Sequence, residues 1–183
     1  SLDSLFLDGQ VLNYAVQNNN PDMVRYLVEH HGQNFNEKLN IQDLIVFLIR
    51  QECYTQIVCD ILCESNTSKW KTKVDVNDSR ELLLEAIDRG NNEIVECLLN
   101  SDGKYWQGKL DVNRSRCPLT AAITQGNIEI VQALLSSDGR HWKEKLNINN
   151  GALIAAIAKN NIEIVQILLN SDGRRWKEKL NIN

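Results

Sequence analysis

The chain has 183 residues, of which 43% are hydrophobic and 24% are charged, and its formal net charge is −4. This composition suits a packed core, and the negative balance argues against a protein built mainly to hold nucleic acid. The sequence contains no run of about 18 apolar residues that would span a membrane, and residues 1–16 lack the basic start and apolar core of a signal peptide.

Residues 1–9 precede any regular pattern, and we expect this N-terminal segment to cover the open end of the helical region that begins at residue 10. The turn of the first helical pattern reads Asn20-Pro21-Asp22. Asn caps helix N-termini, Pro fits the first helical position, and an acid in the first turn interacts favourably with the helix dipole. The sequence therefore predicts a helix, a tight turn and a second helix that begins at Pro21.

The same helix–turn–helix pattern returns four times along the chain. The units start near residues 10, 44, 81, 117 and 151, so successive starts are 34, 37, 36 and 34 residues apart. A period of this length is typical of stacked units that each contact only their neighbours. We therefore predict one elongated array over residues 10–183. An aromatic residue keeps a similar spacing, at Phe35, Trp70, Trp106, Trp142 and Trp176.

The fourth unit shows the pattern most completely. Cys117-Pro118 opens a first helix, and Gly126-Asn127 supplies residues that tolerate a left-handed turn. Apolar residues at helical spacing in 128–135 then form the face of a second helix. Asp-Gly pairs at 102–103, 138–139 and 172–173 predict a further turn after each of the last three second helices.

Residues 117–122, CPLTAA, with GNIEIV at 126–131 and the paired leucines at 134–135, resemble the ankyrin repeat. The resemblance covers residue 10 to the end and implies an all-α, ankyrin-like helical solenoid of stacked helix–turn–helix repeats. The segment after each second helix is longer than in a typical repeat, and the following finger is shorter. We interpret this as an added helical turn that carries the Trp, and as shortened fingers. The family's His is replaced in each unit, by Asn13, Phe47, Leu84, Thr120 and Ile154.

The resemblance also implies a non-catalytic protein–protein interaction module that binds a partner protein or peptide in a concave groove formed by the first helices and the fingers. The residues just before each turn differ between units while the framework repeats, as expected of an exposed recognition strip. Arginines in the fingers favour a partner with some acidic character. We expect a monomer that needs no cofactor. The predicted groove residues are Gln17, Asn18, Gln51, Glu52, Asp88, Arg89, Thr124, Gln125, Lys159, Arg80, Arg114 and Arg116.

The cysteines predict no disulfide framework, because their number is odd and their positions do not recur in repeat register. Two of them, Cys59 and Cys63, share a helix face, but further metal ligands do not accompany them. We therefore expect free, buried thiols, no metal site, and a reducing compartment such as the cytosol or the nucleus. The five cysteines are Cys53, Cys59, Cys63, Cys97 and Cys117.

Two alternatives from other classes remain. The sequence contains no phosphate-binding loop, zinc motif or nucleophile motif, so an enzymatic role would need a catalytic domain outside these residues. The array would then be a substrate-recruiting arm of a multidomain enzyme, or of a bacterial effector that acts in a host cytosol. The repeat stops where another first helix is due, which favours a fragment of a longer protein.

The second alternative is binding of nucleic acid or an acidic membrane by the basic residues around Trp142 and Trp176. Neighbouring acids weaken this positive charge. We instead expect each Trp ring to pack on the second helices of its own unit and the next.

Overall fold

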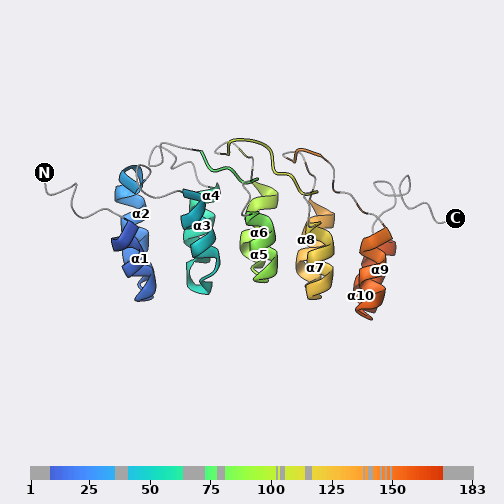
Figure 1. Ribbon diagram of the computed structural model, residues 1–183. Coiled ribbons are helices and arrows are strands. Elements are labelled where there is room, and N and C mark those ends of the chain that lie inside the picture. The colour runs from blue at the N-terminus through green and yellow to red at the C-terminus, as the bar shows by residue number, and fades with distance from the viewer. Residues whose placement is uncertain are drawn as a thin grey trace, which may run out of the picture.

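The computed structural model describes residues 9–35, 41–63, 73–77, 81–101, 103, 106–113, 117–137, 139, 142–144, 146, 148 and 150–170. Within these residues the chain forms five helical hairpins stacked side by side (Figure 1), which confirms the predicted all-α solenoid. The helices are α1 (Gly9–Gln17), α2 (Pro21–Phe35), α3 (Ile41–Ile49), the 3₁₀ helix η2 (Glu52–Tyr54), α4 (Thr55–Cys63), α5 (Leu82–Asp88), α6 (Asn92–Asn100), α7 (Pro118–Gln125), α8 (Ile128–Ser136), α9 (Asn150–Ala158) and α10 (Ile162–Asn170).

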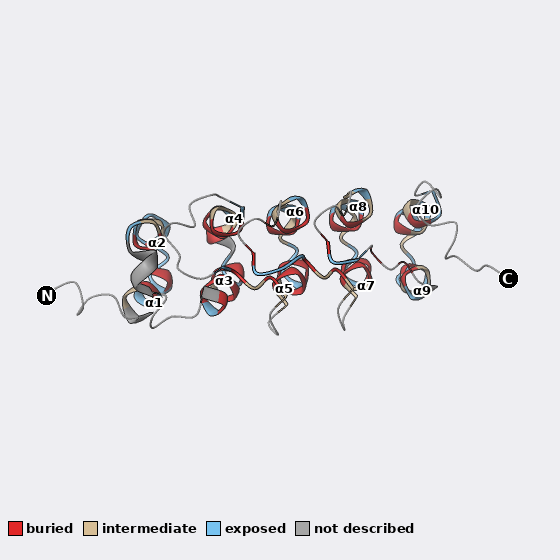
Figure 2. Ribbon diagram, turned by 90° about the horizontal axis from the view of Figure 1, so that it is seen from above, coloured by how far each residue is buried: buried red, intermediate tan, exposed pale blue. Residues whose placement is uncertain are grey.

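The helices form two rows. Seen from above, the first helices α1, α3, α5, α7 and α9 lie in one row, and the second helices lie in the other (Figure 2). Neighbouring units pack first helix on first helix and second helix on second helix, from α3 through α10. Their apolar side chains form one core that runs the length of the stack. The predicted N-terminal cover, residues 1–9, lies outside the described residues except for Gly9, which begins α1. Most residues of the predicted shortened fingers also lie outside them.

The hairpin turns follow from their sequences. Gly90 and Gly126 have φ of +65° and +72°, and Asn19 and Asn160 occupy the same place in other units with φ of +50° and +53°. Glycine and asparagine are the residues that adopt this left-handed conformation most easily. An asparagine follows each of them and caps the second helix through its side-chain oxygen, at Asn20, Asn91, Asn127 and Asn161. The predicted turn at Asn20-Pro21-Asp22 is confirmed.

The second unit departs from this turn. Cys53 occupies the place of the left-handed residue, and the chain forms the short helix η2 there instead. A left-handed conformation strains a cysteine more than a glycine or an asparagine, which accounts for the change. Tyr54 replaces the capping asparagine; its ring is buried, and its hydroxyl donates to the Val16 carbonyl oxygen at 3.4 Å.

The segments that carry Trp106 and Trp142 are extended, so the predicted added helical turn was wrong. The C-cap residues Ser101 and Ser137 are already in extended conformation, with ψ of 143° and 136°. Gly103 then adopts φ +64° and closes a turn in which the Trp106 backbone N–H donates to the Gly103 carbonyl oxygen at 3.1 Å. Gly139 and Trp142 repeat this arrangement, so the predicted Asp-Gly turns are confirmed at both glycines.

Each of these connectors pairs in parallel with the connector before it. Trp106 bridges to Val74, and Trp142 bridges to Leu110. The backbone N–H of Lys143 donates to the Leu110 carbonyl oxygen at 2.8 Å. The lengthened connectors therefore add a second, backbone-based contact between neighbouring units.

Both described tryptophan rings are buried, with exposed fractions of 3% for Trp106 and 6% for Trp142. The predicted burial is thus confirmed. The indole N–H of Trp106 donates to the Leu62 carbonyl oxygen of α4 at 3.1 Å, a contact with the preceding unit that the prediction did not include. Rings in these positions cannot stack on nucleic-acid bases without leaving the core.

One disulfide joins neighbouring units, against the expectation of free thiols. Cys63 at the end of α4 and Cys97 within α6 are bonded, and their Cα atoms are 6.5 Å apart. The two positions are not equivalent in the repeat, which hid the pairing, although their separation of 34 residues is close to the repeat period. Cys53, Cys59 and Cys117 are free, as expected, but the expectation that they are buried was wrong: Cys53 is exposed, and Cys59 and Cys117 are half-buried. The disulfide weakens the argument for a reducing compartment, and the cytosol or nucleus stays a prediction.

Burial raises the pKa of Cys59 to about 11, with smaller contributions from the carboxylates of Glu93 and Asp60. This thiol therefore stays protonated at neutral pH and is a poor nucleophile.

Within the described part of the chain, none of the helices has the length and apolar character needed to cross a membrane.

Candidate functional site

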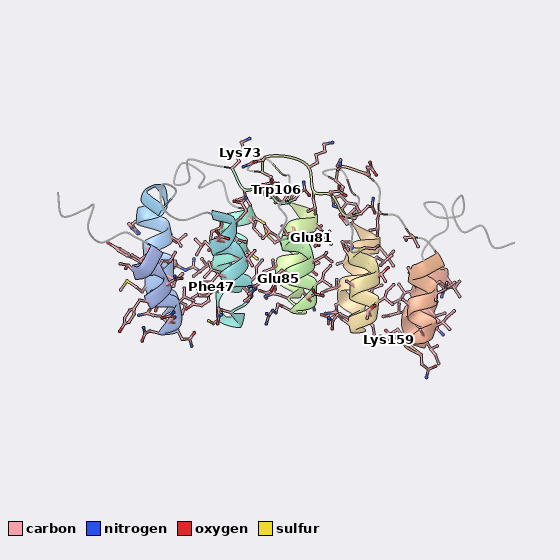
Figure 3. The ribbon with its side chains drawn as sticks, viewed as in Figure 1. Phe47, Lys73, Glu81, Glu85, Trp106 and Lys159 are labelled. Carbon is pink, nitrogen blue, oxygen red and sulfur yellow. A yellow bond between two sulfur atoms is a disulfide. The ribbon has the colours of Figure 1, made fainter. Side chains whose placement is uncertain are left out.

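The predicted groove residues that the structure describes lie at the C-terminal ends of the first helices, and their side chains are exposed. They follow one edge of the stack, at the opposite end of the helices from the connectors. Figure 3 shows Lys159 at this edge and Trp106 at the other. The side chain of Glu52 and the finger residues Arg80, Arg114 and Arg116 lie outside what the structure describes.

Three of these predicted side chains already bond within their own unit. The Asn18 amide donates to the Tyr14 carbonyl oxygen at 2.8 Å, and the Thr124 hydroxyl donates to the Thr120 carbonyl oxygen at 2.7 Å. The guanidinium of Arg89 lies 3.5 Å from Glu85. These contacts hold the side chains close to their helices.

A hollow of about 440 Å³ lies between α1 and α3, on the row of first helices. Its floor is apolar, and its rim is polar and exposed. This is also where the first unit packs less closely on its neighbour than the later units do. The floor consists of the buried Leu12, Leu44 and Val46 with the half-buried Phe47, and the rim consists of Asn13, Asp43 and Arg50.

An ion-pair network continues from the rim of the hollow to the next unit. Arg50 donates two hydrogen bonds to the Glu85 carboxylate, at 2.9 Å from Nε and 3.3 Å from a terminal nitrogen. Arg89 approaches the same carboxylate from its own helix. The hydrogen bond from Arg50 is the largest cause of a lowered pKa of Glu85, so this carboxylate is ionised at neutral pH. In Figure 3, Phe47 lies between α1 and α3, and Glu85 lies between α3 and α5.

The described part of the first-helix face carries no excess of positive charge. Its bases Arg50, Arg89 and Lys159 are matched by the acids Asp43, Glu85 and Asp88. The predicted preference for an acidic partner therefore depends on the three finger arginines outside the described residues.

Sequence reasoning missed the hollow and its rim. Asn13 and Phe47 stood out only as replacements of the family's His, whereas nothing in the sequence pattern singled out Asp43, Arg50 or Glu85. One signal was present: Arg50 is 35 residues from Glu85, close to the repeat period, which allows side chains of neighbouring units to meet.

This geometry defines a class of protein, a stack of helical hairpins whose described first helices present a polar face with an apolar hollow between α1 and α3. Among the described residues, no three His, Cys, Asp or Glu side chains gather as a metal site would require.

A family model described as ankyrin repeats, in three copies, matches residues 12–145 and again residues 83–179. These matches span most of the chain, which belongs to the ankyrin repeat family. Ankyrin repeats are generally protein–protein interaction modules and are typically non-catalytic. No curated protein and no solved structure matches the chain significantly.

Proposed function

We propose that this chain is a non-catalytic binding module that takes a segment of a partner protein along its first helices, anchored in the hollow between α1 and α3. The observation that carries the proposal is the composition of the hollow. An apolar floor with a few polar groups at its rim is the usual anatomy of a pocket that receives one anchoring side chain.

The partner segment would insert a bulky aliphatic or aromatic side chain next to Phe47 and flank it with polar groups that meet Asp43 and Arg50. The ion pair between Arg50 and Glu85 supports this role because it holds the rim in one arrangement before binding. Little ordering entropy then opposes association. The exposed strip from Gln17 to Lys159 provides further polar contacts along the same row.

The test is a pull-down from a eukaryotic lysate, with captured proteins identified by mass spectrometry and their direct binding measured by calorimetry. The variant Asn13→Trp places a large ring at the rim and fills the hollow. Its matched control, Asn100→Trp, makes the same change at an exposed position of α6 in the other row. A second variant changes the predicted strip through Asp88→Ala, Arg89→Ala, Thr124→Ala and Gln125→Ala.

We expect a partner that binds the parent and the Asn100→Trp control with equal affinity and loses at least about tenfold in affinity with Asn13→Trp. A smaller loss is expected with the strip variant. Equal binding by Asn13→Trp and the control would refute the hollow as the anchor. Loss of partner binding only in the strip variant would place the binding site at the C-terminal ends of the first helices instead of the hollow.

A further inference from the structure

Three cysteines lie together where α4 packs on α6, in the row of second helices (Figure 2). Cys63 and Cys97 form the disulfide, whereas Cys59, one turn before Cys63 on α4, is a free thiol. The proposed binding function uses neither the disulfide nor this thiol, so their proximity calls for an explanation of its own.

Cys97 lies between the two cysteines of α4. Its sulfur is bonded to that of Cys63 and lies 3.8 Å from the Cys59 backbone carbonyl oxygen. The Cys59 thiol in turn faces α6, with its sulfur 3.9 Å from the Glu93 carbonyl oxygen, one turn before Cys97. Both cysteines of α4 therefore point toward the same stretch of α6.

Repeat register supports a direct pairing of Cys59 with Cys97. In unit one the place of Cys59 belongs to Arg25, and in unit two the place of Cys97 belongs to Asp60. Arg25 and Asp60 meet across the preceding interface, where their charged groups are 2.8 Å apart. Side chains at these two places thus come into contact when neighbouring second helices pack. The bond to Cys63 is therefore one of two pairings within reach of Cys97.

We propose that this disulfide is a movable latch, in which Cys59 can take the place of Cys63 as the partner of Cys97. The Cys59 thiolate attacks the Cys97 sulfur, the bond between these two sulfurs forms, and the bond between Cys63 and Cys97 breaks. Cys63 leaves as a thiolate and takes up a proton in place of the one that Cys59 lost. Nothing is oxidised or reduced overall, so the step moves an existing disulfide and cannot create one.

The exchange changes two properties of the array. The bond that joins units two and three moves by one turn along α4, and the free thiol moves from the half-buried Cys59 to Cys63 at the exposed end of that helix. An exposed thiol reacts more readily with an external disulfide, whether of a small thiol compound or of another protein. The latch thereby couples the joint between two units to the thiol–disulfide state of the surroundings.

The surroundings of Cys59 keep the exchange slow at neutral pH. Burial is the main cause that raises the pKa of this thiol to about 11, and the carboxylates of Glu93 on α6 and Asp60 on α4 add to it. The charge of Asp60 is offset by its ion pair with Arg25 of α2. Because only the thiolate attacks, the exchange rate should rise about tenfold per pH unit below this pKa.

The experiment follows which cysteine is free in the oxidised full chain, held without added thiol at about pH 7 and about pH 10. Samples are quenched in acid, unfolded and labelled with N-ethylmaleimide. A protease that cleaves before aspartate separates Cys59 from Cys63 at Asp60, and mass spectrometry locates the label. Cys59→Ser removes the attacking thiol, and Cys117→Ser, which removes another half-buried free thiol, is its matched control. Circular dichroism checks that both variants fold.

At about pH 10 we expect the label to move from Cys59 to Cys63 in the parent and in Cys117→Ser, at a rate that about tenfold dilution leaves unchanged. At about pH 7 the label should stay on Cys59 over the same time, because the rate is about a thousandfold lower. A parent that keeps the label on Cys59 at both pH values would overturn the proposal. Labelling of Cys63 in Cys59→Ser at the rate of the parent would do the same.

A further variant tests that Cys59 is the attacking group. Glu93→Gln removes a carboxylate that raises the pKa of Cys59, so the exchange at about pH 9 should be about threefold faster than in the parent. Glu163→Gln makes the same change at the equivalent place in the last unit and should leave the rate unchanged. An unchanged rate in Glu93→Gln would assign the attack to a different thiol and overturn the proposal.

Discussion

The first two units and the third and fourth units use the same repeated pattern but join in different ways. Units three and four meet through regular contacts: the Asn127 amide donates to the Asn92 side-chain oxygen at 2.9 Å, and Asn92 in turn donates to Glu129. Their connectors also pair in parallel through Leu110 and Trp142, which bridge to each other.

Among the described residues, units one and two meet through individual side chains. Arg25 of α2 pairs with Asp60 of α4 at 2.8 Å, and Tyr54 reaches the Val16 carbonyl oxygen. The first helices α1 and α3 leave a hollow instead of a closed contact. Within the described residues, connector pairing accompanies the closed interface between units three and four, whereas the irregular turn of unit two accompanies the hollow between α1 and α3. The proposed anchor site and the regularly packed units thus lie in different parts of one array.

The disulfide joins unit two, which has the irregular turn, to unit three, and its loss should cause the largest fall in the free energy of unfolding. It closes a separation of 34 residues, for which loop-closure entropy gives about 3–4 kcal/mol of stabilisation. Cys63→Ser should lower the free energy of unfolding by this amount in urea titrations without reductant. The parent in reductant should match the variant. Identical stability of the parent with and without reductant would contradict the disulfide, and Cys117→Ser serves as the control.

Two leucines at the same repeat position test the difference in packing directly. Leu119 and Leu12 are both almost fully buried, but only Leu12 borders the hollow. Leu119→Ala should cost about 3 kcal/mol of stability in denaturant unfolding, whereas Leu12→Ala should cost only about 1–2 kcal/mol because the site can relax into the hollow. Equal costs would show that the two interfaces pack equally well.

Loss of a capping asparagine should also cost more stability in unit four than in unit one. Asn127→Ala removes the cap of α8 and the bond to Asn92, and should cost about 1.5 kcal/mol, the sum of a typical cap and part of a hydrogen bond. Asn20→Ala removes the cap bond to the Met23 backbone N–H and should cost about 1 kcal/mol. Thermal unfolding of both variants measures the difference, and a larger cost for Asn20→Ala would reverse the ranking of the two regions.

Loss of the ion pair between Arg50 and Glu85 should have the smallest effect on stability, and this effect should appear in the pH dependence of the free energy of unfolding. The pKa of Glu85 is lower in the folded chain than its usual 4.5, first because of the hydrogen bond from Arg50. Its stabilisation is therefore present above pH 4.5 and is lost as pH falls through the lowered folded pKa. Arg50 is half exposed, so screening limits the contribution to about 0.5 kcal/mol.

Glu85→Gln should accordingly flatten the acid limb of a stability profile measured between about pH 6 and about pH 3. Glu163→Gln, an exposed position on the last helix, is the control and should leave the limb unchanged. An identical profile for Glu85→Gln and the parent would mean that the pair contributes nothing to folding.

Much of the fold could be predicted because its determinants are local. Pro118 and Pro21 begin helices, Gly126 permits the left-handed turn, and Asn127 caps the helix that comes after it; each acts within a few residues of chain. Equivalent residues recur at the repeat period, and this periodicity implies stacking. The connectors were mispredicted because their extended form depends on pairing with the preceding unit, a contact that no local pattern encodes.

The sequence by itself determined the helical hairpins, their number and their order in the array, since backbone preferences and apolar spacing act between near neighbours in the chain. Only the tertiary structure decided that Cys63 meets Cys97, that Arg50 meets Glu85, and that α1 and α3 leave a hollow. These outcomes depend on how closely one unit packs on the next, which is set by side-chain shapes about one repeat apart. The candidate binding site therefore lies where the packing departs from the repeat, and the repeat alone could not locate it.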